Sequence, residues 1–378
     1  MRKQIIFIIC CMLLANMFYA CKNKDVSDDK YIEFAKQIEQ NIIEGNPEFL
    51  NQAFDYQIFY GYVLENMDLN EMQKAEAESY IKNNLRPGNT IVEAVINGAD
   101  FHFVKFYRDE NNQPKLVFRI YFNGGIVIEE WEVKAKKEQI VIQDVFSIVS
   151  GIKWSEDYRQ RLNNYFNIVT EDVVNINRLI QVNMLVANED YQIADSLLSY
   201  VLPSMQNYLY ARVMEMNLAS VLKDYEYVKD KANQFVKDFP SEERIAIFYS
   251  LQSAIGNGLI EEVNQHIEKL SIIVGNDPIY YVYRSWAFQR VEAYDYALQA
   301  LDSVIANIPS LFDLYIEKMD IYYIQEQYDQ LVKVLQFIDT LFIPNESDID
   351  YFSKRYPKIV QNESFKIWKD QHTTKIVS

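Results

Sequence analysis

The second half of the chain repeats itself at an interval that restricts how it can fold. Aromatic or aliphatic residues recur at intervals of 34, 35, 34 and 34 positions, at Tyr191, Tyr225, Ile260, Tyr294 and Tyr328. Each is followed by apolar residues three, seven and ten positions later, and these offsets lie on one face of a helix. A unit of this size cannot bury such a face alone, so stacked neighbours must supply the core. We therefore expect a helical solenoid with an extended concave surface that is suited to binding.

This repeat resembles the tetratricopeptide repeat family, whose unit is about 34 residues of helix, turn and helix, closed by a proline. Pro240 and Pro309 fall fifteen residues after Tyr225 and Tyr294, which is the closing position of the family. The resemblance covers residues 171–344 and implies about five repeats with a helical cap from 349 to 369, within an all-α solenoid over residues 153–372. The first helix of the fourth repeat departs from the family's Trp, Leu and Gly, and has instead Tyr281, Arg284 and Ser285.

The resemblance also implies a set of partner-binding residues, because certain first-helix positions of the family line the concave groove. On this chain those positions are Leu179, Asn183, Tyr210, Val213, Asn217, Phe248, Gln252, Val282, Trp286, Ile316 and Asp320. The amides among them can hydrogen-bond an extended peptide backbone, and Trp286 offers a flat apolar anchor. None of them is basic, so we expect no clamp for acidic peptide C-termini. The alternative interpretation is that the aromatic members pack between adjacent helices.

The first half predicts a different architecture, with helices followed by strands. Apolar spacing is helical from Tyr31 to about Leu85, and a third helix is expected from Asn70 to Asn84, ended by residues 86–88. Apolar residues then alternate over residues 116–122, which predicts a half-buried strand, and the turns at 111–113 and 123–125 place further strands over residues 101–108, 126–134 and 140–149. We expect an α+β domain over residues 31–152, with four or five antiparallel strands. In element order it resembles the NTF2-like and cystatin-like rolls.

Residues 1–20 have the pattern of an export signal. A basic start precedes an apolar run from Ile5 to Leu14, which is too short to span a bilayer comfortably. Ala20 before Cys21 resembles the bacterial lipobox, which implies lipidation of Cys21 and a polar tether over residues 21–30. Because Cys10 and Cys11 leave with the leader, Cys21 would be the single remaining cysteine. The expected product is an outer-membrane lipoprotein, periplasmic or surface-facing, and the alternative is a plain secretory signal.

Composition and motifs argue against several function classes. A formal net charge of −17 disfavours nucleic acid as a partner, because binding phosphates requires clustered Lys and Arg. No two His or Cys residues stand at metal-ligand spacing, and phosphate-binding and nucleophile motifs are absent from the sequence, so we expect no metal, cofactor or enzymatic activity. His102 is the one candidate base, and Glu130 and Glu132 fall on the same strand face, opposite to Glu129.

These observations lead to one leading hypothesis and two alternatives. The leading hypothesis is a non-enzymatic envelope lipoprotein whose solenoid holds a protein or peptide partner as a scaffold. One alternative is glycan capture, because SusD-like lipoproteins also combine a lipidated cysteine with such helices and because Tyr and Trp can stack on sugar rings. The other alternative is an NTF2-like enzyme, which requires His102 to share a pocket with Glu130 or Glu132.

Overall fold

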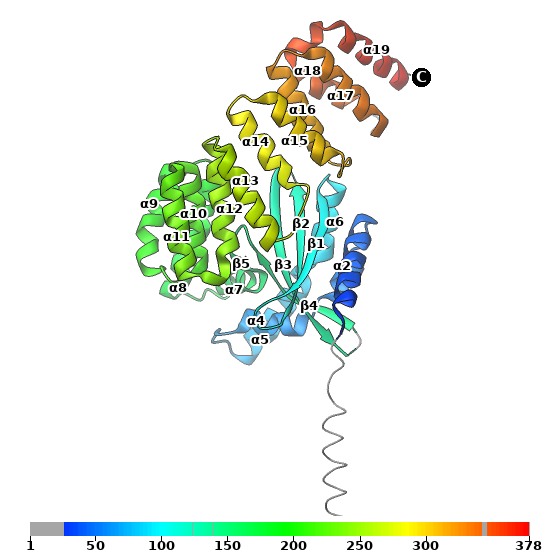
Figure 1. Cartoon of the computed structure of the whole chain (residues 1–378). Coiled ribbons are helices and arrows are strands. Elements are labelled where there is room, and N and C mark those ends of the chain that lie inside the picture. Colours follow the sequence, from blue (N-terminus) through cyan, green and yellow to red (C-terminus); the bar gives the residue numbers. More distant parts are fainter. Residues whose placement is uncertain (1–25, 123, 138, 342–345, 378) are drawn as a thin grey trace, which may run out of the picture.

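A computed structural model describes residues 26–122, 124–137, 139–341 and 346–377, and shows helices, then an antiparallel sheet, then a long helical half (Figure 1). The leader, Cys21 and most of the tether lie outside the described residues. The first helices are α2 (Asp28–Ile43), α3 (Pro47–Ala53), α4 (Tyr56–Leu64), α5 (Glu71–Asn84) and α6 (Pro87–Ile96).

Local side-chain chemistry explains where these helices begin. Asn70 accepts a hydrogen bond from the Gln73 backbone N at 3.0 Å, and the Gln73 side chain accepts one from the Asn70 backbone N at 3.1 Å. This reciprocal cap starts α5 and confirms the predicted helix. Asp55 caps α4 by accepting from the Ile58 N at 3.3 Å, so α3 and α4 are separate helices.

Helix α6 was not predicted, because residues 86–88 were expected to end α5 and lead into strands. Pro87 instead begins the new helix, where its missing N–H costs nothing. Gly88 is required by close packing, since a Cβ there would lie 2.1 Å from the backbone O of Pro47 in α3.

The sheet has five antiparallel strands in sequence order, as expected from the alternation and the turns. They are β1 (Asp100–Arg108), β2 (Pro114–Phe122), β3 (Gly125–Lys136), β4 (Gln139–Ser147) and β5 (Ile152–Lys153). The expectation that residues 116–122 form a half-buried strand is wrong, because the residues of β2 from Pro114 to Arg119 are all buried.

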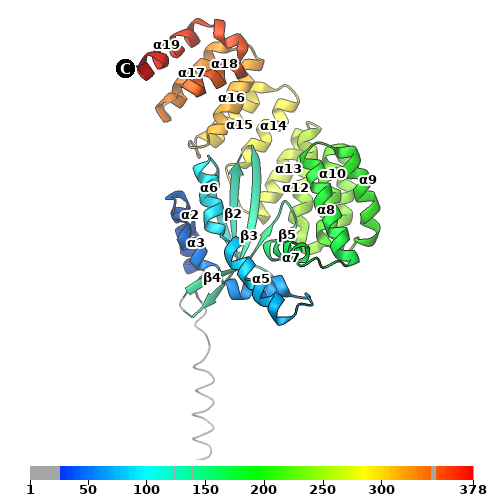
Figure 2. The same cartoon turned by 180° about the vertical axis from the view of Figure 1, so that it is seen from behind.

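Both faces of the sheet are covered, as Figures 1 and 2 show from opposite sides. Leu116, Phe118 and Trp131 point to the face that packs on α2–α6 and on α7 (Trp154–Tyr165). Val117 and Tyr121, the alternate residues of β2, belong to a second core shared with the helical half. The sheet therefore lies between the two sets of helices.

In the helical half, every second helix begins at one of the five residues that recur in the sequence every 34 or 35 positions. These helices are α9 (Tyr191–Val201), α11 (Tyr225–Asp238), α13 (Ile260–Ile273), α15 (Tyr294–Ile305) and α17 (Tyr328–Leu341). The helices before them are α8 (Glu171–Ala187), α10 (Leu209–Leu222), α12 (Glu243–Gly256), α14 (Tyr280–Arg290) and α16 (Phe312–Ile324), and α18 (Glu346–Arg355) and α19 (Glu363–Val377) follow.

Helix α7 packs with the first half of the chain, although the expected boundary at residue 153 assigns it to the second. Tyr158 and Leu162 share the core of α2–α6.

Within the described ranges, every helix is either too short or too polar to cross a bilayer.

Candidate binding site

The inner face of the first helical pairs is covered by the chain's own sheet. The Tyr249 hydroxyl in α12 donates to the backbone O of Val149, just beyond β4, at 2.6 Å. Gly151 packs so closely on α10 that a Cβ there would lie 2.4 Å from Cγ2 of Val213, and its φ of +65° also favours glycine. The concave surface expected from the repeat is therefore an internal interface over these helices.

A buried ion pair joins the sheet to the segment between α13 and α14. Nε of Arg119 in β2 lies 2.8 Å from Oδ2 of Asp277, and Nη1 of Arg119 also bonds to Asp100. The side chains of Arg119 and Asp277 are each only 1% exposed. Burial disfavours the guanidinium charge, but the two carboxylates outweigh it and raise the pKa of Arg119. Loss of either partner would leave an unpaired charge in the interface.

The predicted groove residues divide into buried and accessible positions. Five are buried and cannot be reached by a partner in this structure, which corrects their assignment as contact residues: Leu179, Tyr210, Val213, Phe248 and Val282. Asn183 is exposed, and five others are half-buried: Asn217, Gln252, Trp286, Ile316 and Asp320. The Asp320 carboxylate already pairs with Arg355 of α18 at 2.6 Å.

The arrangement required for an NTF2-like enzyme is not formed. Nδ1 of His102 lies 2.7 Å from Oε1 of Glu39 in α2, and this hydrogen bond raises the pKa of His102. Glu130 and Glu132 do line one cavity, on the face expected, but His102 is not among its lining residues. Burial alone would raise the pKa of Glu132, but Lys153 and Lys115 lower it below its usual range. Glu132 is therefore an ionised partner of two lysines rather than a proton donor.

The described residues contain no group of His, Cys, Asp and Glu side chains that could hold a metal ion.

Glu129 faces away from Glu130, as expected, and accepts a hydrogen bond from Nε1 of Trp131 at 3.1 Å. Burial raises the pKa of Glu129 to about 7.

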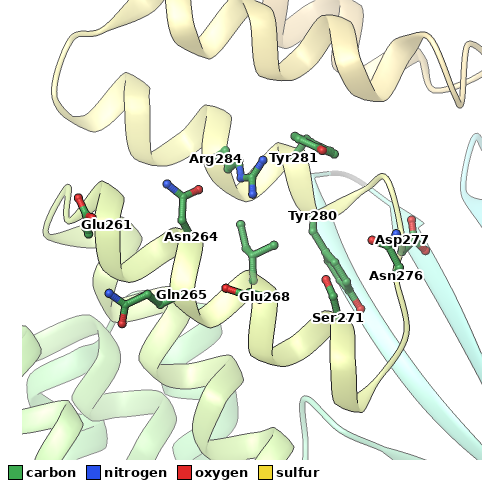
Figure 3. Close-up of a pocket in the computed structure, with 11 residues that line it drawn as sticks. Glu261, Asn264, Gln265, Glu268, Ser271, Asn276, Asp277, Tyr280, Tyr281 and Arg284 are labelled. Carbon is green, nitrogen blue, oxygen red and sulfur yellow. The ribbon is translucent and has the colours of Figure 1, made fainter.

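A cleft with a volume of about 440 Å³ lies between α13 and α14 in the helical half (Figure 3). We call it the α13–α14 cleft. In Figure 3, Arg284 of α14 points toward the side chains of α13, and Tyr281 lies beside it at the edge of the cleft. Its polar lining residues are Glu261, Asn264, Gln265, Glu268, Ser271, Asn276, Asp277, Tyr280, Tyr281 and Arg284.

The linker between α13 and α14 is attached to the sheet. Pro278 falls eighteen residues after Ile260, three later than the closing prolines of the second and fourth repeats, and it lies in the linker between the two helices. Asp277 in the linker is tied to the sheet, and Gly275 adopts a φ of +129° beside Val104 of β1. These contacts hold the linker on the sheet and away from the surface of α13.

The cleft contains side chains with unused hydrogen-bonding capacity. The Arg284 guanidinium lies 4.6 Å from the centre of the Tyr281 ring, and its Nε is buried without a hydrogen-bond partner. The side chains of Asn264, Gln265 and Ser271 make no hydrogen bond to another part of the described chain. A ligand is the natural partner for such groups.

Sequence reasoning singled out Tyr281 and Arg284 only as departures from the family pattern. That departure was the available signal, because an arginine replaces an apolar residue at a helix-packing position. The polar residues of α13 carried no signal, since an exposed helix face is normally polar.

Comparison of the chain with protein-family models, curated proteins and solved structures finds no match.

Proposed function

We propose that this protein is a non-enzymatic lipoprotein of the cell envelope that binds a polypeptide partner in the α13–α14 cleft. The regular helix starts support a tetratricopeptide-like solenoid for the helical half. The element order supports an NTF2-like or cystatin-like roll for the first half. The observation that carries the proposal is the set of unpaired polar groups that α13 and α14 present to each other.

The geometry of α13 fits an extended peptide. Asn264, Glu268 and Ser271 are spaced four and three residues apart, so they follow one face of the helix. They span roughly 10 Å at the rise of an α-helix, which is the length of about three extended residues. Amide and hydroxyl groups along this line can both donate to and accept from a peptide backbone.

The charges of the cleft restrict the sequence of that peptide. Among the described residues Glu261 and Glu268 of α13 form no ion pair, and Arg284 is the one cation that lines the cleft there. A segment with a basic side chain can pair with the carboxylates, while a backbone carbonyl accepts from Arg284. The Tyr281 ring adds an aromatic surface at the same place.

A binding experiment on the purified full chain tests this proposal. A library of extended peptides is screened by fluorescence polarisation, and the best binders are titrated against Arg284→Ala and Asn264→Ala. Each variant should lose about tenfold in affinity, the effect of one hydrogen bond that involves a charged or well-placed polar group. Lys269→Ala is the matched control, because Lys269 lies on α13 outside the cleft lining. Equal affinity for all three variants would refute the cleft as the peptide site.

Membrane attachment is tested separately at Cys21. We expect radiolabelled palmitate to be incorporated into the wild-type chain in cells and not into Cys21→Ala, which should appear in the soluble fraction. Labelling of the variant, or retention of the variant in the membrane fraction, would contradict anchoring at this residue.

A further inference from the structure

A second cavity, distinct from the α13–α14 cleft, lies between the sheet and the helical half and has a volume of about 580 Å³. We call it the interface cavity. Its walls come from all five strands, from the first turn of α7, from the N-terminal end of α10, and from the start of α12 with the preceding 3-10 turn η2 (Pro240–Glu242). Cavities of this size between two parts of a protein are the usual location of small-molecule sites.

The charged residues of the interface cavity are arranged as opposed pairs. Nη2 of Arg244 lies 3.3 Å from Oε1 of Glu130 and 3.0 Å from Oε2 of Glu242. On the other side, Oε1 of Glu132 lies 2.9 Å from Nζ of Lys115 and 2.7 Å from Nζ of Lys153. Because these charges already face opposite ones, a charged ligand that approached them would have to compete with the existing pairs.

The balance of charge disfavours anions further. Four basic side chains and six acidic ones line the interface cavity, which leaves two negative charges in excess. Paired carboxylates keep free lone pairs, and paired guanidinium and ammonium groups keep free N–H groups. A ligand with neighbouring hydroxyl groups can therefore donate to the carboxylates and accept from the cations without carrying a charge itself.

Two further features of the interface cavity favour such a ligand. Nε of Arg244 is buried and has no hydrogen-bond partner within the described chain. Tyr107, Tyr208 and Tyr210 line the same space, and the rings of Tyr208 and Tyr210 meet edge to face with centres 6.5 Å apart. Aromatic faces beside polar groups match the apolar faces and hydroxyl edges of a sugar ring.

We propose that the interface cavity binds a neutral carbohydrate. Glu130, Glu242 and Arg244 would hydrogen-bond its hydroxyl groups, and the tyrosine rings would contact its C–H faces. The site exists only while the sheet is seated on the helices, so the bound sugar would stabilise that interface. This site shares no lining residue with the peptide cleft, so it does not depend on peptide binding.

Calorimetric titration of the purified full chain tests the proposal with defined probes. Glucose, galactose, mannose, N-acetylglucosamine, maltose and cellobiose are the neutral set, and glucuronic acid and glucosamine are the charged counterparts. At least one neutral sugar should bind, and it should bind more tightly than its charged counterparts. Glu242→Gln and Tyr208→Ala should each weaken binding by about tenfold.

The controls keep the experiment decisive. Tyr200→Ala removes an exposed aromatic residue of α9 outside the interface cavity and should leave affinity unchanged. Glu242→Gln keeps the shape of the side chain, and circular dichroism confirms that each variant is folded. The proposal is overturned if no neutral sugar binds the wild type, if the charged counterparts bind more tightly, or if Glu242→Gln and Tyr208→Ala bind as well as Tyr200→Ala.

Discussion

Replacing Arg119 by Met should strongly destabilise the protein, because it leaves Asp277 as an unpaired charge in the interface between sheet and helices. Asp277 and Arg119 are both 1% exposed, whereas the second carboxylate, Asp100, is 20% exposed and can be solvated. Removing one partner of a buried ion pair costs about 3–5 kcal/mol. We expect a loss in this range, most of it arising at Asp277.

Urea denaturation measures this loss, with tryptophan fluorescence and far-UV circular dichroism as two probes of the transition. The double variant Arg119→Met, Asp277→Asn removes the uncompensated charge, and the amide oxygen can still accept from the Ile279 backbone N, now 2.9 Å from Oδ1. We expect the double variant to recover at least about 1.5 kcal/mol of the loss, since replacing a whole buried pair is often close to neutral.

Lys358→Ala is the control for this experiment, because Lys358 and Glu326 form an ion pair whose side chains are 63% and 65% exposed. It should leave the urea midpoint unchanged, as exposed pairs contribute little. The reasoning is refuted if Arg119→Met costs less than about 1 kcal/mol, well below the range for buried pairs, or if the double variant is less stable than the single one.

Two further predictions concern stability. Burial raises the pKa of Glu129 from 4.5 to about 7. Between these pH values the folded state holds a proton that the unfolded state releases. The contribution of Glu129 to the free energy of unfolding therefore falls as pH rises from 4.5 to 7. Glu129→Gln should therefore match the wild type in urea denaturation at pH 4.5 and exceed it by up to about 3 kcal/mol at pH 8; a constant difference across this range would contradict the assigned pKa. Gly151→Ala should cost about 2–4 kcal/mol, because it combines a positive φ with overpacking against Val213. Gly45→Ala is its matched control, since Gly45 has a φ of +76° but open space around its Cα, and equal losses in the two variants would show that Gly151 does not pack against α10.

Much of the local structure could be predicted from the sequence, because it depends on near neighbours. The 34-residue period gave the starts of α9, α11, α13, α15 and α17, and alternation and turn residues located four strands within a few residues. Helix α6 was missed because a Pro-Gly pair can follow the end of one helix or begin the next, and the sequence alone does not distinguish the two.

The contacts between distant segments could not be predicted. Alternating residues such as Val117 and Tyr121 are compatible with either a solvated or a covered outer face, and only the packing of the helical half decides between them. Arg119 and Asp277 are 158 positions apart, and nothing in either local sequence indicates that they pair. The groove prediction failed for its five buried residues for this reason, since it assumed that the helices face solvent.

The location of the polypeptide site is tested most directly by photo-crosslinking in intact cell envelopes. The photo-reactive residue p-benzoylphenylalanine is placed either at Gln265, which is exposed and lines the α13–α14 cleft, or at Asn217 on α10. Asn217 belongs to the concave groove that the tetratricopeptide resemblance implies. We predict a discrete polypeptide adduct from position 265 that is lost in the Arg284→Ala background, and no adduct from position 217. An adduct from position 217 with none from position 265 would contradict the proposal, because it would locate the binding site in the concave groove.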